Sequence, residues 1–192
     1  MNEYVDHFHR QVVAPLECVI GRQLIDVYYW VLSVDAPTFN IDAPNQSGSV
    51  RVVVLQFDDA VLEVDLGVER ELTNSDAFEN IHLIVRADAE VIDRTAAEQL
   101  GFGGWTYVQA STGLHWSKTL HKKLEHVSVF GDNLRPVAIS FEFQQATIMI
   151  AVGDGQWSPT VIGDGDDLLL FSGDEWKIAD RSISIKVIWH ST

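Results

Sequence analysis

The chain has 192 residues, of which 28 are acidic and 13 are Lys or Arg, so its net charge is −15 at neutral pH. Such a charge repels nucleic acid, whose binding depends on Lys and Arg side chains that neutralise phosphates, and it also repels anionic membranes. No apolar run approaches the about 20 residues that span a bilayer, and a hydrophobic content of 46% excludes a disordered chain.

The N-terminal residues, the cysteine content and the length also predict the compartment and the number of domains. Residues 1–13 are polar and carry acids, which is not typical of a signal peptide. Cys18 is the only cysteine, so no disulfide can form within the chain, and this suits a reducing, cytoplasmic compartment. The length favours one domain, or two small halves that share a core.

The first third of the chain predicts helix, then strand, then loop. Residues 1–21 are expected to be helical in two pieces, the second beginning at Pro15, with Gly21 as the terminator. Residues 24–32 are rich in Val, Tyr and Trp and apolar on both faces, which predicts a central strand covered on each side. Residues 34–48 hold two Pro together with Asn, Asp and Ser, which indicates a loop.

The next stretch, Ser49–Gly67, is predicted to be a β-hairpin. Apolar residues alternate on both sides of the pair Asp58-Asp59, and Asp tolerates the conformations of a tight turn. A further strand is expected at residues 81–92 and a short helix at residues 93–100. The Gly-rich segment 101–105 then forms a joint near the middle of the chain.

The second half predicts a similar series of elements. A short helix is expected at residues 117–124, because Leu120 and Leu124 lie one turn apart. A strand at residues 125–130 follows, and then a second hairpin. The last two strands are predicted at residues 168–171 and 182–189, which brings the total to about ten strands and three short helices.

The two halves also resemble each other residue by residue. Ser49–Gly67 recurs without gaps as Pro136–Gly153, and residues 24–30 match residues 124–130. Matched positions are 100 residues apart in the first strand and 86 apart in the hairpin. The difference, 100 minus 86, is 14 residues and falls in the loop 34–48, where an insertion is tolerated best.

The fold class that follows is α+β and mostly antiparallel β, with a pseudo-duplicated helix–strand–hairpin unit and a few short helices. Residues 1–192 are expected to form a single domain built from two related halves, about 1–100 and 114–192, joined by the Gly-rich segment 101–105. The sequence leaves open whether the halves share one sheet or form two.

Sequence motifs predict no metal, no cofactor and no catalytic residue, so we do not expect an enzyme. Residues 163–167, GDGDD, contain Gly where a calcium loop needs its first Asp. The histidines follow no zinc-site spacing, and no G-x-S-x-G motif is present. Residues 101–104, GFGG, lack the Lys of a phosphate-binding loop. Cys18 lies in an apolar stretch and is expected to be a buried structural thiol.

A cluster of basic residues stands out in such an acidic chain. It is formed by Lys118, Lys122 and Lys123 with His115 and His121. On a helix, these Lys side chains would point outward, which is typical of a solvated surface. The alternative is contact with an anionic ligand or with an acidic patch on a second copy of the chain.

The two hairpins differ in charge at equivalent positions. Glu63 and Asp65 in the first are replaced by Met149 and Ala151 in the second. The second hairpin is therefore expected to be covered on both faces, whereas the first leaves one face wet and acidic. Such a face serves either solubility alone or the docking of a basic partner, whose association rate and specificity it would raise.

The leading hypothesis is a non-catalytic acidic binding protein, whose partner-binding residues are Asp58, Asp59, Glu63 and Asp65. The acidity, small size and lack of catalytic motifs are similar in kind to those of bacterial immunity proteins, which neutralise basic toxin domains. This likeness in composition implies a basic toxin or nuclease domain as the partner.

Two other classes of function remain open. The first is a small-molecule-binding or hydrolytic domain with a cleft between the halves, lined by Trp105, Trp116 and Trp157, which lie near Gly-rich joints. The second is a structural or assembly subunit that associates through the apolar C-terminal strand. The oligomeric state is not predicted.

Overall fold

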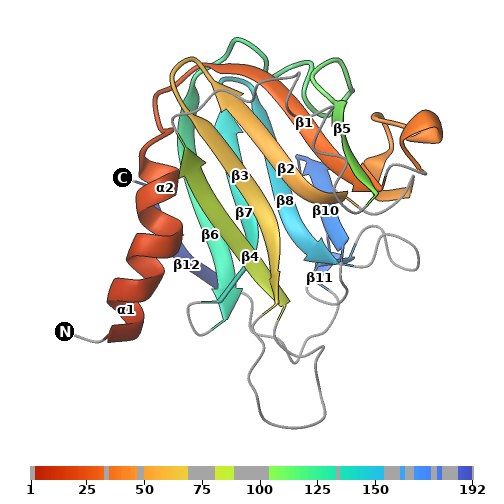
Figure 1. The fold of residues 1–192 in the computed structure, drawn as a ribbon. Coiled ribbons are helices and arrows are strands. Elements are labelled where there is room, and N and C mark those ends of the chain that lie inside the picture. Colours follow the sequence, from red (N-terminus) through yellow and green to blue (C-terminus); the bar gives the residue numbers. More distant parts are fainter. Residues whose placement is uncertain are drawn as a thin grey trace, which may run out of the picture.

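The structure is a computed structural model that describes residues 3–32, 35–46, 50–68, 81–88, 104–132, 135–153, 161–162, 167–173, 177–178 and 186–191. It is a β-rich fold of two sheets that lie face to face (Figure 1). The pairing of the described strands is antiparallel except between the short strands β9 and β11. The prediction of a mostly antiparallel β fold is confirmed.

Each sheet has a series of five strands in an equivalent order. The first is β4-β3-β2-β1-β5, with β1 Leu24–Leu32, β2 Val50–Phe57, β3 Val61–Val68, β4 Ile81–Asp88 and β5 Trp105–Gln109. The second contains β10-β8-β7-β6-β12, with β6 Leu124–Asp132, β7 Arg135–Phe143, β8 Ala146–Gly153, β10 Asp167–Ser172 and β12 Lys186–His190. Two short strands, β9 Val161–Ile162 and β11 Lys177–Ile178, extend the second sheet beyond β8.

The two sheets also share their strand register. Leu24 pairs with Phe57 in the first sheet, and Leu124 pairs with Phe143 in the second. A bulge follows each of these pairs at the same place. β1 therefore pairs with the first hairpin in the same register in which β6 pairs with the second, and this is the register that the ungapped sequence match indicates.

The sheets are joined where the chain enters β1 and β6, by a contact with local two-fold symmetry. The N–H of Gly21 donates to the carbonyl of Leu124 at 2.8 Å, and the N–H of His121 donates to the carbonyl of Leu24 at 2.7 Å. Gln23 and Lys123 form an antiparallel bridge between these bonds. Gly21 and His121 both have positive φ, +81° and +60°, so the two turns share a left-handed backbone conformation.

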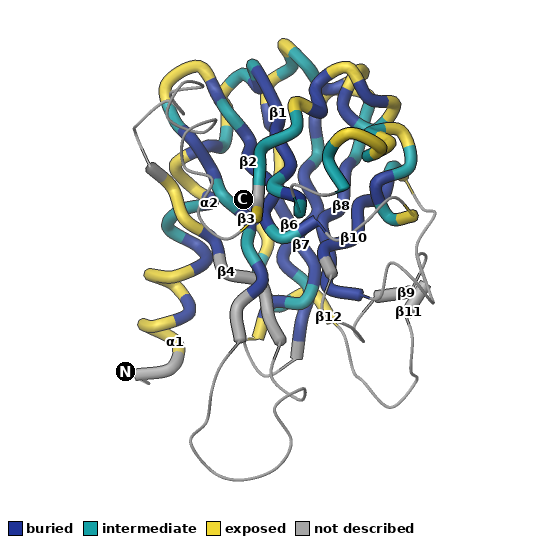
Figure 2. Tube along the Cα trace, turned by 45° about the vertical axis from the view of Figure 1, so that its right-hand side comes forward, coloured by how far each residue is buried: buried dark blue, intermediate teal, exposed yellow. Residues whose placement is uncertain are grey.

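The main hydrophobic core lies between the sheets. Alternate residues of β1, β2, β3, β7 and β8 point inward, as a period of two requires, and in Figure 2 the described residues of these strands are mostly buried. The largest fully buried side chains come from both halves: Trp116, Tyr29, Phe57, Phe141, Leu16, Leu24, Leu55, Leu62, Leu66, Leu124 and Ile139.

One helical run covers the side of the sandwich beside β4 (Figure 1). It consists of three consecutive pieces, α1 Glu3–Phe8, the π-helical turn η1 His9–Val13 and α2 Ala14–Glu17, and Pro15 lies in the first turn of the last piece as predicted. Val12 and Leu16 are among the residues that it buries in the main core. Two 3-10 turns, η2 Ala36–Thr38 and η3 Pro44–Gln46, lie in the predicted loop.

One prediction about a single element is wrong. Residues 117–124 form turns that lead into β6, not a helix, because Leu124 is already the first residue of that strand. β1 is an interior strand between β2 and β5 and is largely buried on both faces, as predicted, although β5 itself was not predicted. The helix expected at 93–100 and the loop 163–166 lie outside the described residues.

Candidate functional site

The structure separates the four predicted carboxylates into two pairs. Asp58 and Asp59 are exposed in the bend between β2 and β3, which is closed by a hydrogen bond from the N–H of Phe57 to the carbonyl of Ala60 at 2.7 Å. Asp59 forms an ion pair with Arg22, at the end of the molecule where the two sheets are joined. Asp65 lies six residues further along the strand, roughly 20 Å away. The bend and the middle of β3 are therefore different surfaces.

Glu63 and Asp65 lie together on the outer face of β3, but they are not an unpaired acidic face. Arg86 on β4 lies 3.6 Å from Glu63 and 3.5 Å from Asp65, and Arg51 on β2 lies 3.3 Å from Asp65. Glu63 and Arg86 are direct partners in the strand register. The expectation of a purely acidic, wet face is corrected, because arginines from both neighbouring strands reach the two carboxylates.

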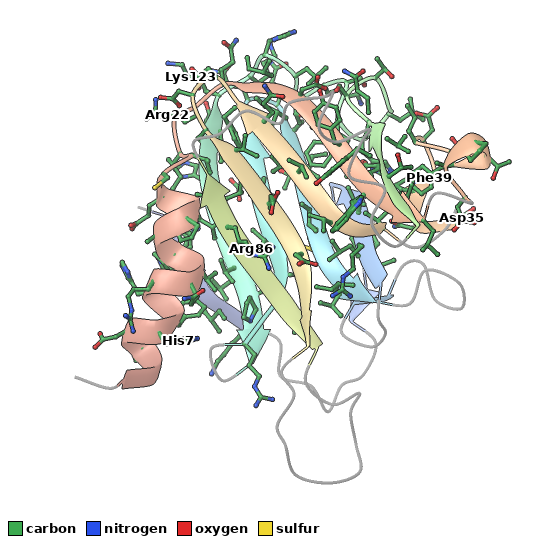
Figure 3. All side chains as sticks on the ribbon, viewed as in Figure 1. His7, Arg22, Asp35, Phe39, Arg86 and Lys123 are labelled. Carbon is green, nitrogen blue, oxygen red and sulfur yellow. The ribbon has the colours of Figure 1, made fainter. Side chains whose placement is uncertain are left out.

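The carboxylates nevertheless keep hydrogen-bonding capacity. The side chain of Asp65 is 15% exposed and that of Glu63 is 31% exposed. Oδ1 of Asp65 is buried and accepts no hydrogen bond among the described residues, although it lies near Arg51. Arg86 is 54% exposed and projects from β4 (Figure 3).

Aromatic side chains lie on the same outer face, beyond β2. The rings of Trp30 on β1 and Tyr107 on β5 stack with their centroids 5.8 Å apart and their planes at 11°. Both are partly exposed and pack against a small apolar cluster that includes Tyr28 and Val54. We call this surface, with its carboxylates and arginines, the first outer face; its residues are Tyr28, Trp30, Arg51, Val52, Val54, Val61, Glu63, Asp65, Arg86 and Tyr107.

The carboxylates and the aromatic rings are close enough to interact electrostatically. The pKa of the Tyr107 phenol is raised, mainly because the ring is partly buried and also because the negative charge of Glu63 disfavours a phenolate. In the strand register Tyr107 lies in line with Trp30, Val52 and Asp65, whereas Glu63 lies in line with Val54 and Tyr28. The buried side chains of Val52 and Val54 on β2 therefore lie between the carboxylates and the stacked rings.

A buried carboxylate supports the aromatic side of this face. Asp26, at the start of β1, is 6% exposed. Its two oxygens accept hydrogen bonds from the Tyr28 hydroxyl at 2.7 Å, from the Gln109 amide at 3.0 and 2.9 Å, from the Val27 N–H at 3.0 Å and from the Ser111 hydroxyl. Asp26 thereby fixes Tyr28 and ties β5 to β1.

The equivalent face of the second sheet has a different character. Met149, Ala151 and Phe171 are at most 4% exposed there and form an apolar cluster with Ala138 and Leu169. In the register, Met149 and Ala151 face Ser140 and Ala138 on β7, as Glu63 and Asp65 face Val54 and Val52 on β2. The burial predicted for Met149 and Ala151 is confirmed.

Two of the other candidate residues, Trp116 and Cys18, lie in the described part of the chain. Trp116 is fully buried and donates a hydrogen bond from Nε1 to the Tyr29 hydroxyl, so it lines no cleft. The side chain of Trp105 and all of Trp157 lie outside the described residues. Cys18 is exposed, not buried as predicted, because Leu16 and Val19 on either side of it turn into the core.

The basic residues gather near the bridge between the sheets. Figure 3 shows Lys123 and Arg22 at the same end of the molecule, and Lys118 and His121 are exposed in the turns before β6. In the described part of the chain no group of three His, Cys, Asp or Glu could hold a metal ion, and no helix is long and apolar enough to cross a membrane.

Sequence reasoning found Glu63 and Asp65 but missed the arginines and the aromatic pair. Period-two alternation places Trp30 on the same face of β1 as Tyr28, which was a usable signal. Tyr107 had none, because β5 was not predicted. No family model matches this chain, and neither the curated proteins nor the solved structures include a match to it.

Proposed function

We propose that this chain is a non-catalytic binding protein that takes a basic protein partner, such as a toxin or nuclease domain, on the first outer face. The observation that carries the proposal is the contrast between two sheets of equal register. One outer face is apolar and buried, whereas the other presents Glu63, Asp65 and Arg86 beside the partly exposed rings of Trp30 and Tyr107.

The composition of this face suits protein recognition. Trp, Tyr and Arg contribute most of the binding free energy in protein interfaces, typically from positions where they are already held rigidly. Trp30 and Tyr107 are held by their mutual stacking, and Arg86 is held by two carboxylates. The net charge of −15, to which Asp58 and Asp59 contribute from their separate surface, would accelerate the approach of a basic partner.

The duplication predicted from the sequence is part of this proposal. It is supported by the equal strand order of the two five-strand series, by the equal positions of the bulges after Leu24 and Leu124, and by the reciprocal hydrogen bonds of Gly21 and His121. After a duplication, one outer face would have kept a packing role, while the other acquired charged and aromatic residues.

The test begins with capture of partners on the immobilised chain at 50 and 500 mM NaCl. We expect a basic protein that is retained at the low salt concentration and lost at the high one, because exposed charges are screened by salt. The captured protein is then purified, and its Kd is measured for the wild type, Glu63→Gln and Glu17→Gln. Glu17 is an exposed carboxylate on the helix, so its variant has the same charge change away from the face.

Glu63→Gln should weaken binding by about tenfold, which corresponds to roughly 1.4 kcal/mol and is typical of a charge within an interface. Glu17→Gln should leave the Kd within about twofold. A lack of any basic protein at 50 mM salt, or equal Kd values for the two variants, would contradict the proposed function.

A further inference from the structure

Two exposed histidines lie against each other on the outer face of the second sheet. His126 on β6 and His190 on β12 stack with their ring centroids 5.8 Å apart and their planes at 21°. His190 is opposite Ser128 in the strand register, so it is a diagonal neighbour of His126 on the same face. No spacing in the sequence signals this pair, because only the pairing of β12 with β6 creates it.

The first sheet shows how an internal contact at this position is built. By strand pairing, Asp26 and Gln109 are the equivalents of His126 and His190. The Gln109 amide donates to both oxygens of Asp26, which is 6% exposed. In the second sheet both equivalent side chains are exposed, and no hydrogen bond joins them. The histidine pair is therefore not a copy of the buried contact, and its ring nitrogens remain accessible from solution.

The hydrogen bonds of the two rings suit metal binding. Nδ1 of His190 lies 2.8 Å from Oγ of Ser128, which is 8% exposed. When Nδ1 donates this hydrogen bond, Nε2 carries the lone pair, and histidines that bind metals are typically oriented in this way. Among the described residues the His126 ring makes no hydrogen bond and no ion pair, so neither of its nitrogens is engaged.

The separation of the rings also suits a single ion. With metal–nitrogen bonds of about 2.0–2.1 Å, two imidazoles on one tetrahedral ion have their centroids roughly 5 Å apart. The rings of His126 and His190 are 5.8 Å apart, so small rotations of two exposed side chains close the difference. Glu142 on β7 is the direct partner of His126 in the register, and its negative charge beside the pair favours a cation.

We propose that His126 and His190 bind one divalent transition-metal ion such as Zn²⁺, and that Ser128 orients His190 for this role. Imidazole nitrogens suit Zn²⁺, Ni²⁺ and Cu²⁺, whereas Mg²⁺ and Ca²⁺ prefer oxygen ligands. Water fills the remaining positions on the ion, because no third His, Cys, Asp or Glu among the described residues joins the pair. The site lies on the second sheet, so it is independent of the function proposed for the first outer face.

The test is a titration of the intact chain with Zn²⁺ in an excess of Mg²⁺, which occupies carboxylates that attract any divalent cation. The imidazole signals are recorded by NMR, because they report each histidine separately. We expect the largest shifts at His126 and His190. The Kd should be about 10–100 µM, weaker than that of a site with three or four protein ligands. Mg²⁺ alone should not shift these two signals.

Substitutions separate the pair from the other histidines. His126→Gln and His190→Gln should each weaken Zn²⁺ binding at least about tenfold, because one imidazole is left. Both positions are exposed, so the variants are expected to fold, and unchanged amide spectra away from the pair check this. His7→Gln is the matched control, because His7 is exposed on α1 (Figure 3), and its Kd should stay within about twofold of the wild type.

The role of Ser128 is tested by two variants of its hydroxyl. Ser128→Ala removes the hydrogen-bond partner of His190 and should weaken Zn²⁺ binding about tenfold. Ser128→Thr keeps the hydroxyl and should bind within about threefold of the wild type. A purely structural effect of the change to Ala would not be reversed by Thr in this way.

Zn²⁺ shifts that are largest at other histidines, or a Kd that is the same for the wild type and His126→Gln, would overturn the inference. An equal loss of affinity in His7→Gln and His190→Gln would overturn it as well, since it would mean that Zn²⁺ binds without preference for the pair. A wild-type Kd in Ser128→Ala would overturn the role given to Ser128.

Discussion

The join between the sheets predicts a pair of substitutions with opposite effects on stability. Gly21 and His121 occupy equivalent turns with φ of +81° and +60°, and each donates its N–H to the opposite half of the chain. A Cβ added at Gly21 would meet no atom within 4 Å, so the cost of Gly21→Ala comes from the backbone alone. A left-handed conformation costs an L-residue about 1–2 kcal/mol, and the smaller entropy of the unfolded Ala chain returns about 0.4–1 kcal/mol.

The net expectation for Gly21→Ala is a loss of about 1 kcal/mol in the free energy of unfolding. His121→Gly relieves the same conformation and should gain a similar amount, since the His121 side chain is exposed. For a chain of this length each change corresponds to a shift in Tm of roughly 2–4 °C, downward for Gly21→Ala and upward for His121→Gly.

Urea unfolding followed by tryptophan fluorescence measures both changes. Two results would refute the reasoning: an unchanged midpoint in Gly21→Ala, which would mean that residue 21 does not have a positive φ, or a loss of stability in His121→Gly. The second would show that the His121 side chain contributes contacts that outweigh its backbone conformation.

Four further substitutions test the core and the outer faces. Burial raises the pKa of Tyr29 well above its ordinary value of about 10, so the stability that the neutral phenol contributes is complete below about pH 10. Above that pH the free energy of unfolding falls by about 1.4 kcal/mol per pH unit. Urea titrations between pH 9 and 11 should show a smaller fall in Tyr29→Phe than in the wild type. Asp26→Leu removes the acceptor of the Tyr28, Gln109 and Ser111 donors, and it should lower the free energy of unfolding by about 3 kcal/mol or more. A loss below about 1 kcal/mol would mean that these donors bind water instead. Met149→Glu places a charge at a 4% exposed position and should lower the free energy of unfolding by at least about 3 kcal/mol. The reciprocal Glu63→Met should change it by less than about 1 kcal/mol, because Glu63 is partly exposed. Equal effects of the two changes in thermal unfolding would show that the two outer faces do not differ.

The hairpins were predictable because strand alternation has a period of two. An ungapped match between Ser49–Gly67 and Pro136–Gly153 can preserve burial only if both hairpins have the same register, and the structure has that register. The turns at residues 117–124 were not predictable in this way. Leu120 and Leu124 are spaced as on a helix, but Leu124 is buried as the first residue of β6 instead.

For a similar reason, only part of the candidate site could be predicted from the sequence. Glu63 and Asp65 share a face because they are two residues apart on one strand. Arg86 reaches them only through the pairing of β3 with β4, across a connection whose length does not determine the register. Tyr107 depends on β5, which returns to the first sheet after the Gly-rich segment and has no turn signal of its own.

Asp65 is the residue that best separates binding from packing on the first outer face. Ala151 at the equivalent position shows that this backbone register accepts a small apolar side chain, fully buried. The chain instead holds a carboxylate there with one buried oxygen that accepts no hydrogen bond among the described residues, and an unmet acceptor of this kind costs about 1–3 kcal/mol. Arg51 and Arg86 offset part of that cost without the geometry of hydrogen bonds. Since alanine satisfies packing at the equivalent position with no such cost, packing alone does not account for the charged network, and this supports the binding role proposed for the first outer face.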